Sequence, residues 1–207
     1  MRLRFLGHAA FDLELAGVRL CLDPHRPGAL GGRFRLPAIL GPFDAVVCTH
    51  RHEDHAGWTP ALGTEQILDR TGTFGPLELE VRAALHDTAG GTRAGLTRMV
   101  SITGAGLRLV HAGDVAQWTP DDVAWLRGAD VLLVPAGGTY TLDGAQAAAL
   151  ARAVGARWTV PMHCRDPRVD LPLAEVDDFA VAWGEPMRAC LEWTPSVPTG
   201  AVLLRAP

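Results

Sequence analysis

The stretch CTHRHEDHAG, residues 48–57, places three histidines and one aspartate within six consecutive positions. It directly follows FDAVV, residues 43–47, an apolar run with the composition of a buried strand. The whole chain has only 8 histidines. This density indicates either an exposed polar loop or one half of a metal site. Imidazole and carboxylate ligands without a thiolate suit zinc, manganese or iron.

Other ligand-type side chains also follow strand-like runs. His86 comes after LELEVRAAL, Asp114 closes LRLVHAGD, and His163 comes after RWTVPM. Strands that stop at such residues predict a site at one edge of a sheet, where loops orient the side chains. Three histidines leave one metal with an open position, and a second metal needs a further carboxylate. Asp54 and Asp114 supply suitable carboxylates.

The composition is that of an ordinary globular protein. The 207 residues are 48% hydrophobic and 20% charged, and the formal net charge of −4 argues against a nucleic-acid partner. No apolar run reaches the roughly 18–20 residues that span a bilayer, so no membrane partner is expected. The 4 cysteines form no CxxC pair, which is typical of a reduced protein. We expect one cytoplasmic domain over residues 1–207.

Short β-like runs dominate the first half of the chain. LRFLG, FDLELAG and VRLCLD predict a meander, and the Gly/Pro/Arg-rich residues 24–42 predict a mobile lid or the rim of a site. A short helix is predicted over residues 59–70. Further helices are predicted in TPDDVAWLRG, DGAQAAALARAVGA and residues 176–183, between strand-like runs. This order favours an α+β protein with two packed sheets and helices outside.

Residues 49–57, THRHEDHAG, resemble the HxHxDH motif of the metallo-β-lactamase superfamily. HAGD and VPMH resemble the later Gly-Asp and strand-end histidine of that superfamily. FLGHAAF, LDP and PAGGTYTLDGAQAAALARAVGARWTVPMH are similar to segments of its short stand-alone metal-dependent hydrolases, which include the ascorbate-6-phosphate lactonase-like proteins. The resemblance implies a four-layer αββα sandwich in which two mixed sheets pack face to face.

The same resemblance implies a dinuclear metal site with seven ligands: His50, His52 and His86 for the first ion, Asp54, His55 and His163 for the second, and Asp114 between them. Two divalent ions are implied, zinc first and manganese or iron as alternatives, with a metal-bound hydroxide as the nucleophile. Asp54 is the expected catalytic residue, because it would orient the hydroxide and carry a proton. Asp23 is expected to support the floor of the site or to cap a turn, and His111 to support the site or to be a packed histidine; neither is expected to bind metal.

Four residues are candidates for contact with the substrate: His8, Arg26, Arg33 and Tyr140. His8 is either a packed histidine or a wall residue that contacts substrate or a ligand carboxylate. Arg26, Arg33 and Arg35 could bind an anion from the long loop. His25 and Arg26 are expected to be solvated unless they meet the substrate.

The expected function is metal-dependent hydrolysis of a small molecule, such as a lactone, an ester or a phosphorylated compound. One alternative is a phosphodiesterase or nuclease that acts on nucleotides or RNA. The other is a metal-binding module without catalytic activity. A homo-oligomer is compatible with all three.

Overall fold

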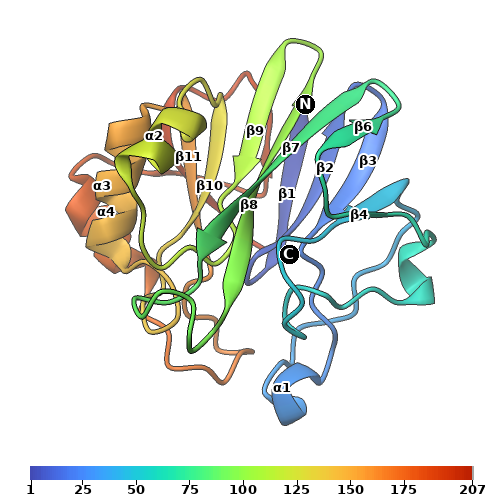
Figure 1. Ribbon diagram of the computed structural model, residues 1–207, viewed down its shortest axis with the longest axis horizontal. Coiled ribbons are helices and arrows are strands. Elements are labelled where there is room, and N and C mark those ends of the chain that lie inside the picture. The colour runs from blue at the N-terminus through green and yellow to red at the C-terminus, as the bar shows by residue number, and fades with distance from the viewer. Residues whose placement is uncertain (207) are drawn as a thin grey trace.

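The computed structural model describes residues 1–206, which form two β-sheets packed against each other (Figure 1). The first sheet has the strand order β13-β1-β2-β3-β4-β5. Its members are β1 (Arg2–Gly7), β2 (Ala10–Leu15), β3 (Val18–Leu22), β4 (Ala45–Val47), β5 (Ile67–Leu68) and β13 (Glu192–Trp193). Strands β1 to β3 are the predicted antiparallel meander, whereas β4 and β5 continue the sheet in parallel.

The second sheet has the order β12-β14-β11-β10-β9-β8-β7-β6. Its members are β6 (Gly72–Phe74), β7 (Leu77–Leu85), β8 (Leu96–Gly104), β9 (Leu107–His111), β10 (Val131–Pro135), β11 (Trp158–Met162), β12 (Arg188–Cys190) and β14 (Gly200–Leu204). Strands β6 to β9 are antiparallel, and the sheet continues in parallel from β9 through β10, β11 and β14 to β12. Both sheets are therefore mixed.

The core between the sheets is built from alternating strand residues. Phe11 and Leu20 of the first sheet are fully buried in one cluster with Ile102 and Leu133 of the second. Full burial of a side chain of this kind contributes about 1.5–3 kcal/mol. The hairpin between β8 and β9 turns at Ala105 and Gly106, both at positive φ, as the TGAG sequence predicts.

Three helices cover the outer face of the second sheet (Figure 1): α2 (Pro120–Leu126), α3 (Gly144–Val154) and α4 (Val176–Trp183). Thr119 and Asp122 form a capping box at the start of α2, and Asp143 and Gln146 form one at the start of α3. Helix α3 ends at Gly155 in the left-handed conformation. The three helices lie where the sequence predicts them.

A 3-10 turn and loop residues, rather than helices, cover the outer face of the first sheet. The prediction of a helix over residues 59–70 is therefore wrong. Only the 3-10 turn η1 (Pro60–Leu62) forms, and Gly63 ends it at φ 77°. Leu62 packs with Ile39 and Phe43 over the sheet, while residues 67–68 pair with β4 as strand β5. The helical periodicity gives way because residues 67–68 gain strand pairing with β4 and Leu62 gains burial over the sheet.

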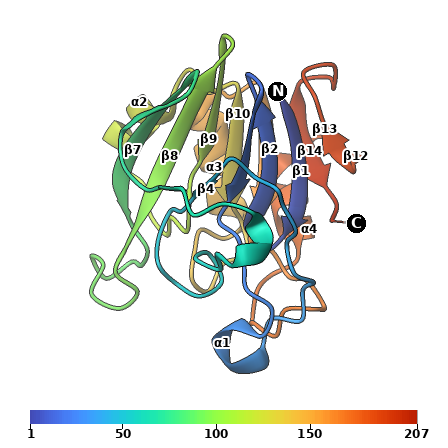
Figure 2. The ribbon, with the colours of Figure 1, turned by 90° about the vertical axis from the view of Figure 1, so that its right-hand side faces the viewer.

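Residues 24–42 form the loop that contains α1 (Ala29–Gly32), at the bottom of the molecule in Figure 2. Leu30 and Gly31 have left-handed backbone conformations inside this turn. Phe34 pairs with Val169 in an isolated β-bridge, and both side chains are buried with Leu36. The loop is therefore anchored by apolar contacts.

The four cysteines are free, and Cys21 and Cys48 are buried, as expected for small core residues. Among residues 1–206, no helix combines the length and the apolar character that crossing a membrane requires.

Candidate metal centre

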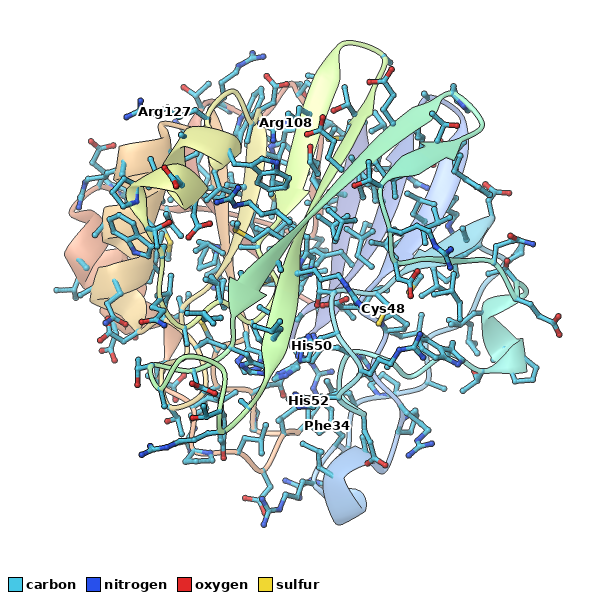
Figure 3. The ribbon with its side chains drawn as sticks, in the orientation of Figure 1. Phe34, Cys48, His50, His52, Arg108 and Arg127 are labelled. Atoms are coloured by element: carbon cyan, nitrogen blue, oxygen red, sulfur yellow. The ribbon has the colours of Figure 1, made fainter. Side chains whose placement is uncertain are left out.

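Six strands end at one edge of the sandwich, and a histidine or an aspartate follows each of them. The residues are His8 after β1, Asp23 after β3, His50 after β4, His86 after β7, Asp114 after β9 and His163 after β11. Strands β1, β3 and β4 belong to the first sheet and the other three to the second. Figure 3 shows His50 and His52 at this edge, above Phe34 of the long loop. Side chains distant in sequence therefore meet here.

Three histidines direct ring nitrogens at one another. His52 Nδ1 lies 3.1 Å from His50 Nε2 and 3.2 Å from His86 Nε2. His86 donates through Nδ1 to the carbonyl oxygen of Tyr140 at 3.2 Å. Because a carbonyl only accepts, His86 Nε2 carries a lone pair.

The same reasoning applies to His50. Thr49 Oγ1 donates to the Asp23 carboxylate at 2.5 Å, so it accepts from His50 Nδ1 at 3.0 Å. With its proton on Nδ1, the neutral ring of His50 carries its lone pair on Nε2. One proton on His52 Nδ1 can satisfy only one of the two facing lone pairs, whereas a metal ion satisfies all three nitrogens. Burial lowers the pKa of His50 to about 3 and also lowers that of His52, which keeps both rings neutral for ligation.

A second group contains His8, Asp54, His55 and His163, whose ligand atoms lie within 4.8 Å of one another. Asp54 Oδ2 is 3.7 Å from His55 Nε2 and 3.2 Å from His8 Nε2. All four side chains are buried. This group joins the loop after β4 to the ends of β1 and β11.

Asp114 lies between the two groups. Its Oδ2 is 3.1 Å from His163 Nε2 and 3.2 Å from His55 Nε2 on one side. On the other side it is 3.6 Å from His86 Nε2 and 3.9 Å from His50 Nε2. A single carboxylate oxygen thus faces four imidazoles, two from each group.

Asp23 orients the ring of His55. Its Oδ2 accepts from His55 Nδ1 at 2.8 Å, and its Oδ1 accepts from the backbone N–H of Thr49 at 2.7 Å. His55 Nε2 therefore points toward Asp114 and Asp54. A carboxylate behind a histidine ligand is a common arrangement at metal sites, because it fixes the tautomer and the ring orientation.

The electrostatics of the cluster favour a cation. Burial by itself would raise the pKa of Asp114 and of Asp54, but neighbouring histidines hold both below the ordinary value. Burial would likewise lower the pKa of His55, yet Asp114 and Asp54 outweigh it and raise the pKa well above its ordinary value. The two carboxylates therefore stabilise a positive charge placed between them, at the centre of the cluster.

The residues fit a divalent metal ion on two counts. The donor set is imidazole nitrogen and carboxylate oxygen, which suits zinc, manganese or iron. Within residues 1–206, His55 Nε2 and Asp114 Oδ1 are buried atoms without a hydrogen-bond partner. Such groups are costly to bury unless something else satisfies them.

A cavity of about 280 Å³ opens beside the cluster. It is lined by the ligand-type residues His52, Asp54, His86, Asp114 and His163 and by Leu30, Arg33, Ala94, Tyr140 and Leu171. Of the residues predicted to meet substrate, Arg33 and Tyr140 line it. Leu30, Ala94 and Leu171 were not predicted, since isolated apolar residues in loops carry no pattern that marks a site.

The structure places Arg26, His8 and His25 elsewhere. Arg26 forms an exposed ion pair with Glu53 at 2.9 Å, and it is absent from the residues that line the cavity. His8 lies behind Asp54 and does not line the cavity either. The expectation that His25 is solvated is wrong: it is 1% exposed, and its Nε2 donates to Pro37 O at 3.1 Å.

His111 is buried behind Asp114 and uses both ring nitrogens. Its Nε2 donates to the carbonyl oxygen of Ala9 at 3.0 Å, and its Nδ1 accepts from the backbone N–H of Gly113 at 3.0 Å. Both ring nitrogens are thus used in holding the segment that ends at Asp114.

Comparison with known proteins agrees with this geometry. A family model described as "Beta-lactamase superfamily domain" matches residues 2–163. The UPF0173 metal-dependent hydrolase of Methanoculleus marisnigri is 32% identical over 192 residues, which cover 79% of this chain and 80% of that protein. The corresponding protein of Ignicoccus hospitalis is 33% identical over 197 residues, covering 79% and 82%. That of Opitutus terrae is 28% identical over 219 residues, covering 91% and 96%.

Solved structures show the same fold. A candidate zinc-dependent hydrolase of the metallo-β-lactamase superfamily from Thermotoga maritima aligns with a TM-score of 0.80 and 24% identity, covering 100% of this chain and 99% of that one. The metallo hydrolase Igni18 from Ignicoccus hospitalis aligns with a TM-score of 0.66 and 24% identity, covering 88% and 90%. The predicted α+β sandwich of two mixed sheets is confirmed. The chain therefore belongs to the metallo-β-lactamase superfamily, among its short stand-alone metal-dependent hydrolases.

Proposed function

We propose that this metal-dependent hydrolase is dinuclear and acts on a small molecule with a lactone, ester or phosphoryl group. The proposal rests on the position of Asp114, whose Oδ2 lies within 4 Å of four histidine Nε2 atoms. The proposed ligands are His50, His52 and His86 for one ion, Asp54, His55 and His163 for the other, and Asp114 for both. Zinc is the first choice for this donor set, and manganese or iron would also fit.

Bound divalent metals would supply Lewis acidity and bring the pKa of a coordinated water toward ~7. The chain itself supplies the proton acceptor. Asp54 lines the cavity and is ionised, since His55 and His8 hold its pKa below the ordinary value against the effect of burial. Its carboxylate can accept a proton at the cavity wall and return it to the leaving group.

The cavity suits a small, partly apolar and acidic substrate. Leu30 and Leu171 form apolar walls, and the guanidinium of Arg33 places a positive charge among the lining residues. Arginine binds carboxylates and phosphates through two parallel hydrogen bonds. Tyr140 has a phenolic O–H that can donate to an oxygen of the substrate.

The proposal can be tested with metal analysis and a panel of lactones, carboxylic esters and phosphodiesters. Asp54→Asn should lower kcat on the best substrate by about 10²–10⁴-fold, the usual contribution of a general acid–base residue. Asp121→Asn is the matched control, because Asp121 is an exposed carboxylate in the first turn of α2 and does not line the cavity. It should retain the activity of the wild type.

Several results would contradict the proposal. Equal kcat of Asp54→Asn and wild type would exclude the role of Asp54, and one metal ion per chain at saturation would exclude the dinuclear site. Full metal loading without turnover on the whole panel would favour a metal-binding module. Turnover of phosphodiesters together with salt-sensitive binding of labelled RNA would favour a nuclease.

A further inference from the structure

His8 joins the two sheets at the site through its backbone. It follows β1 of the first sheet at φ 58°, and His163 follows β11 of the second sheet at φ 56°. The backbone N–H of His163 donates to the carbonyl oxygen of His8 at 2.8 Å. The two turns are therefore connected directly, across the edge where the sheets meet.

The side chain of His8 lies beside Asp54, His55 and His163, the three residues proposed for the second metal ion alone. Its Nε2 lies 3.2 Å from Asp54 Oδ2. Its ring centroid is 4.0 Å from that of His163 and 5.4 Å from that of His55. On another side it meets Phe34 edge-on at 4.9 Å. The side chain is fully buried among these groups.

The chemistry of the two groups defines the direction of this hydrogen bond. A carboxylate oxygen can only accept, whereas an imidazole ring nitrogen that carries a proton donates. At 3.2 Å, His8 Nε2–H is therefore the donor, and Asp54 Oδ2 is the acceptor.

The geometry separates His8 from both the central carboxylate and the substrate cavity. Four histidines reach within 4 Å of Asp114 in the described part of the chain, and His8 is not one of them. His8 is also absent from the residues that line the 280 Å³ cavity. It lines a different cavity of about 90 Å³, together with Cys164 and Asp166. These positions argue against contact with substrate.

We propose that His8 is a positioning residue, which fixes the Asp54 carboxylate through a hydrogen bond and ties it to His163 so that both can bind the second metal ion. The inference rests on the proposed function, because it assumes the second ion. Residues that hold a metal ligand by a hydrogen bond typically contribute 10–100-fold to metal affinity.

The test compares two amides at position 8 in the metal-free full chain, titrated with zinc against a chromophoric chelator. His8→Asn is too short to place its amide at the Nε2 position, although asparagine suits the positive φ. His8→Gln can place its N–H near the Nε2 position. His25→Asn is the matched control, since His25 is also a buried histidine and donates to Pro37 O, outside the cluster.

The wild type and His25→Asn should bind two zinc ions with the same two affinities. His8→Asn should weaken one of them about 10–100-fold and leave the other unchanged, and His8→Gln should recover most of the loss. Equal binding by His8→Asn and wild type would overturn the inference. Equal losses in His8→Asn and His8→Gln would also overturn it, because the hydrogen bond would not be the cause.

The number of zinc ions that the wild-type chain binds distinguishes failure of the inference from failure of the proposed function. A wild-type chain that binds fewer than two zinc ions contradicts the dinuclear site before any variant is compared. A wild-type chain that binds two, with His8→Asn unaffected, contradicts only the role of His8. Urea unfolding of each metal-free variant shows whether a loss of affinity reflects a loss of fold.

Discussion

The position of Asp114 depends on the glycine before it. Gly113 has φ 59°, and a Cβ atom there would lie 2.5 Å from both the carbonyl oxygen of Arg98 and Thr97 Oγ1. Thr97 Oγ1 also accepts from the backbone N–H of Asp114 at 3.2 Å. The chain can therefore approach β8 this closely only with glycine at position 113, and this approach places the Asp114 carboxylate between the histidines.

Gly113→Ala should lower the free energy of unfolding by at least about 2 kcal/mol, because backbone strain and steric overlap add. Gly106→Ala is the matched control: Gly106 has φ 72°, and no atom lies within 4 Å of the point that an alanine methyl group would occupy, so strain alone should cost about 1 kcal/mol. Urea unfolding of the metal-free proteins measures both. Equal losses in the two variants would show that the close approach of Gly113 to β8 has no energetic consequence.

Among the elements, β2 carries two acidic residues whose ion pairs with arginines of β1 and β3 differ in burial. Asp12 on β2 is 3% exposed and accepts from Arg19 Nη2 at 2.9 Å and from Arg4. Glu14, two residues further along β2, pairs with Arg2 at 2.6 Å in an exposed position. Burial would raise the pKa of Asp12, but the hydrogen bonds from Arg19 and Arg4 outweigh it and lower the pKa.

Asp12→Asn should lower the free energy of unfolding by about 2 kcal/mol at pH 7, the usual contribution of hydrogen bonds to a charged group. Glu14→Gln should cost less than about 1 kcal/mol. A lowered folded-state pKa gives stability that is present above the unfolded pKa of about 3.9 and lost as pH falls through the folded value. The difference between wild type and Asp12→Asn, measured by urea unfolding, should therefore shrink below about pH 4. A difference that stays constant from pH 7 to pH 3 would contradict this account.

The loop after β7 depends on one side chain. Asp87 accepts four backbone N–H groups, from Ala89, Gly91, Arg93 and Ala94, at 2.7–2.9 Å. These bonds, that of Ala94 first, lower the pKa of Asp87 far below its ordinary value. Because Ala94 lines the cavity beside the histidine cluster, Asp87 shapes one wall of that cavity.

Asp87→Ala should release this loop and accelerate tryptic cleavage after Arg93, which is exposed. Limited proteolysis followed by mass spectrometry measures the rate. Asp121→Ala, which removes an exposed acid from the first turn of α2, should leave cleavage at Arg93 unchanged. An unchanged rate in Asp87→Ala would mean that other contacts hold the loop.

For the whole molecule, the proposed metal centre is a junction between the two sheets. His50, Asp54 and His55 follow β4 of the first sheet, whereas His86, Asp114 and His163 follow strands of the second. These side chains meet only in the folded chain. Metal ions that bind the folded state alone therefore stabilise the contact between the sheets.

Removal of metal by a chelator should lower Tm by about 5–10 °C, which corresponds to roughly 2.7 kcal/mol at a metal concentration of about 100 Kd. Zinc should restore Tm, and magnesium should not, because a histidine-rich site suits zinc and magnesium prefers oxygen ligands. Differential scanning calorimetry tests this. A Tm that does not respond to metal would indicate that the cluster contributes nothing to the stability of the sandwich.

Much of the architecture is predictable because it depends on neighbouring residues. Thr119 with Asp122, and Asp143 with Gln146, start their helices through contacts within one turn. Apolar runs that end in His or Asp predict the strands and the edge at which they meet. The prediction fails where distant contacts outweigh local ones, as at residues 67–68, which pair with β4 as a strand instead of forming a helix. It also misses the short edge strands β12 and β13, because their sequences carry no local pattern typical of a strand.

By itself, the sequence determined which strands end in ligand-type residues and predicted that the histidine cluster at residues 50–55 is half of a shared site, because both depend on order and spacing along the chain. Only the tertiary structure decided which atoms face one another. It placed His8 behind Asp54, buried His25 within the long loop, and directed Arg26 outward to Glu53. The physical reason is that a ring's orientation depends on partners such as Asp23 and Tyr140, which lie far away in sequence and approach only when the two sheets pack.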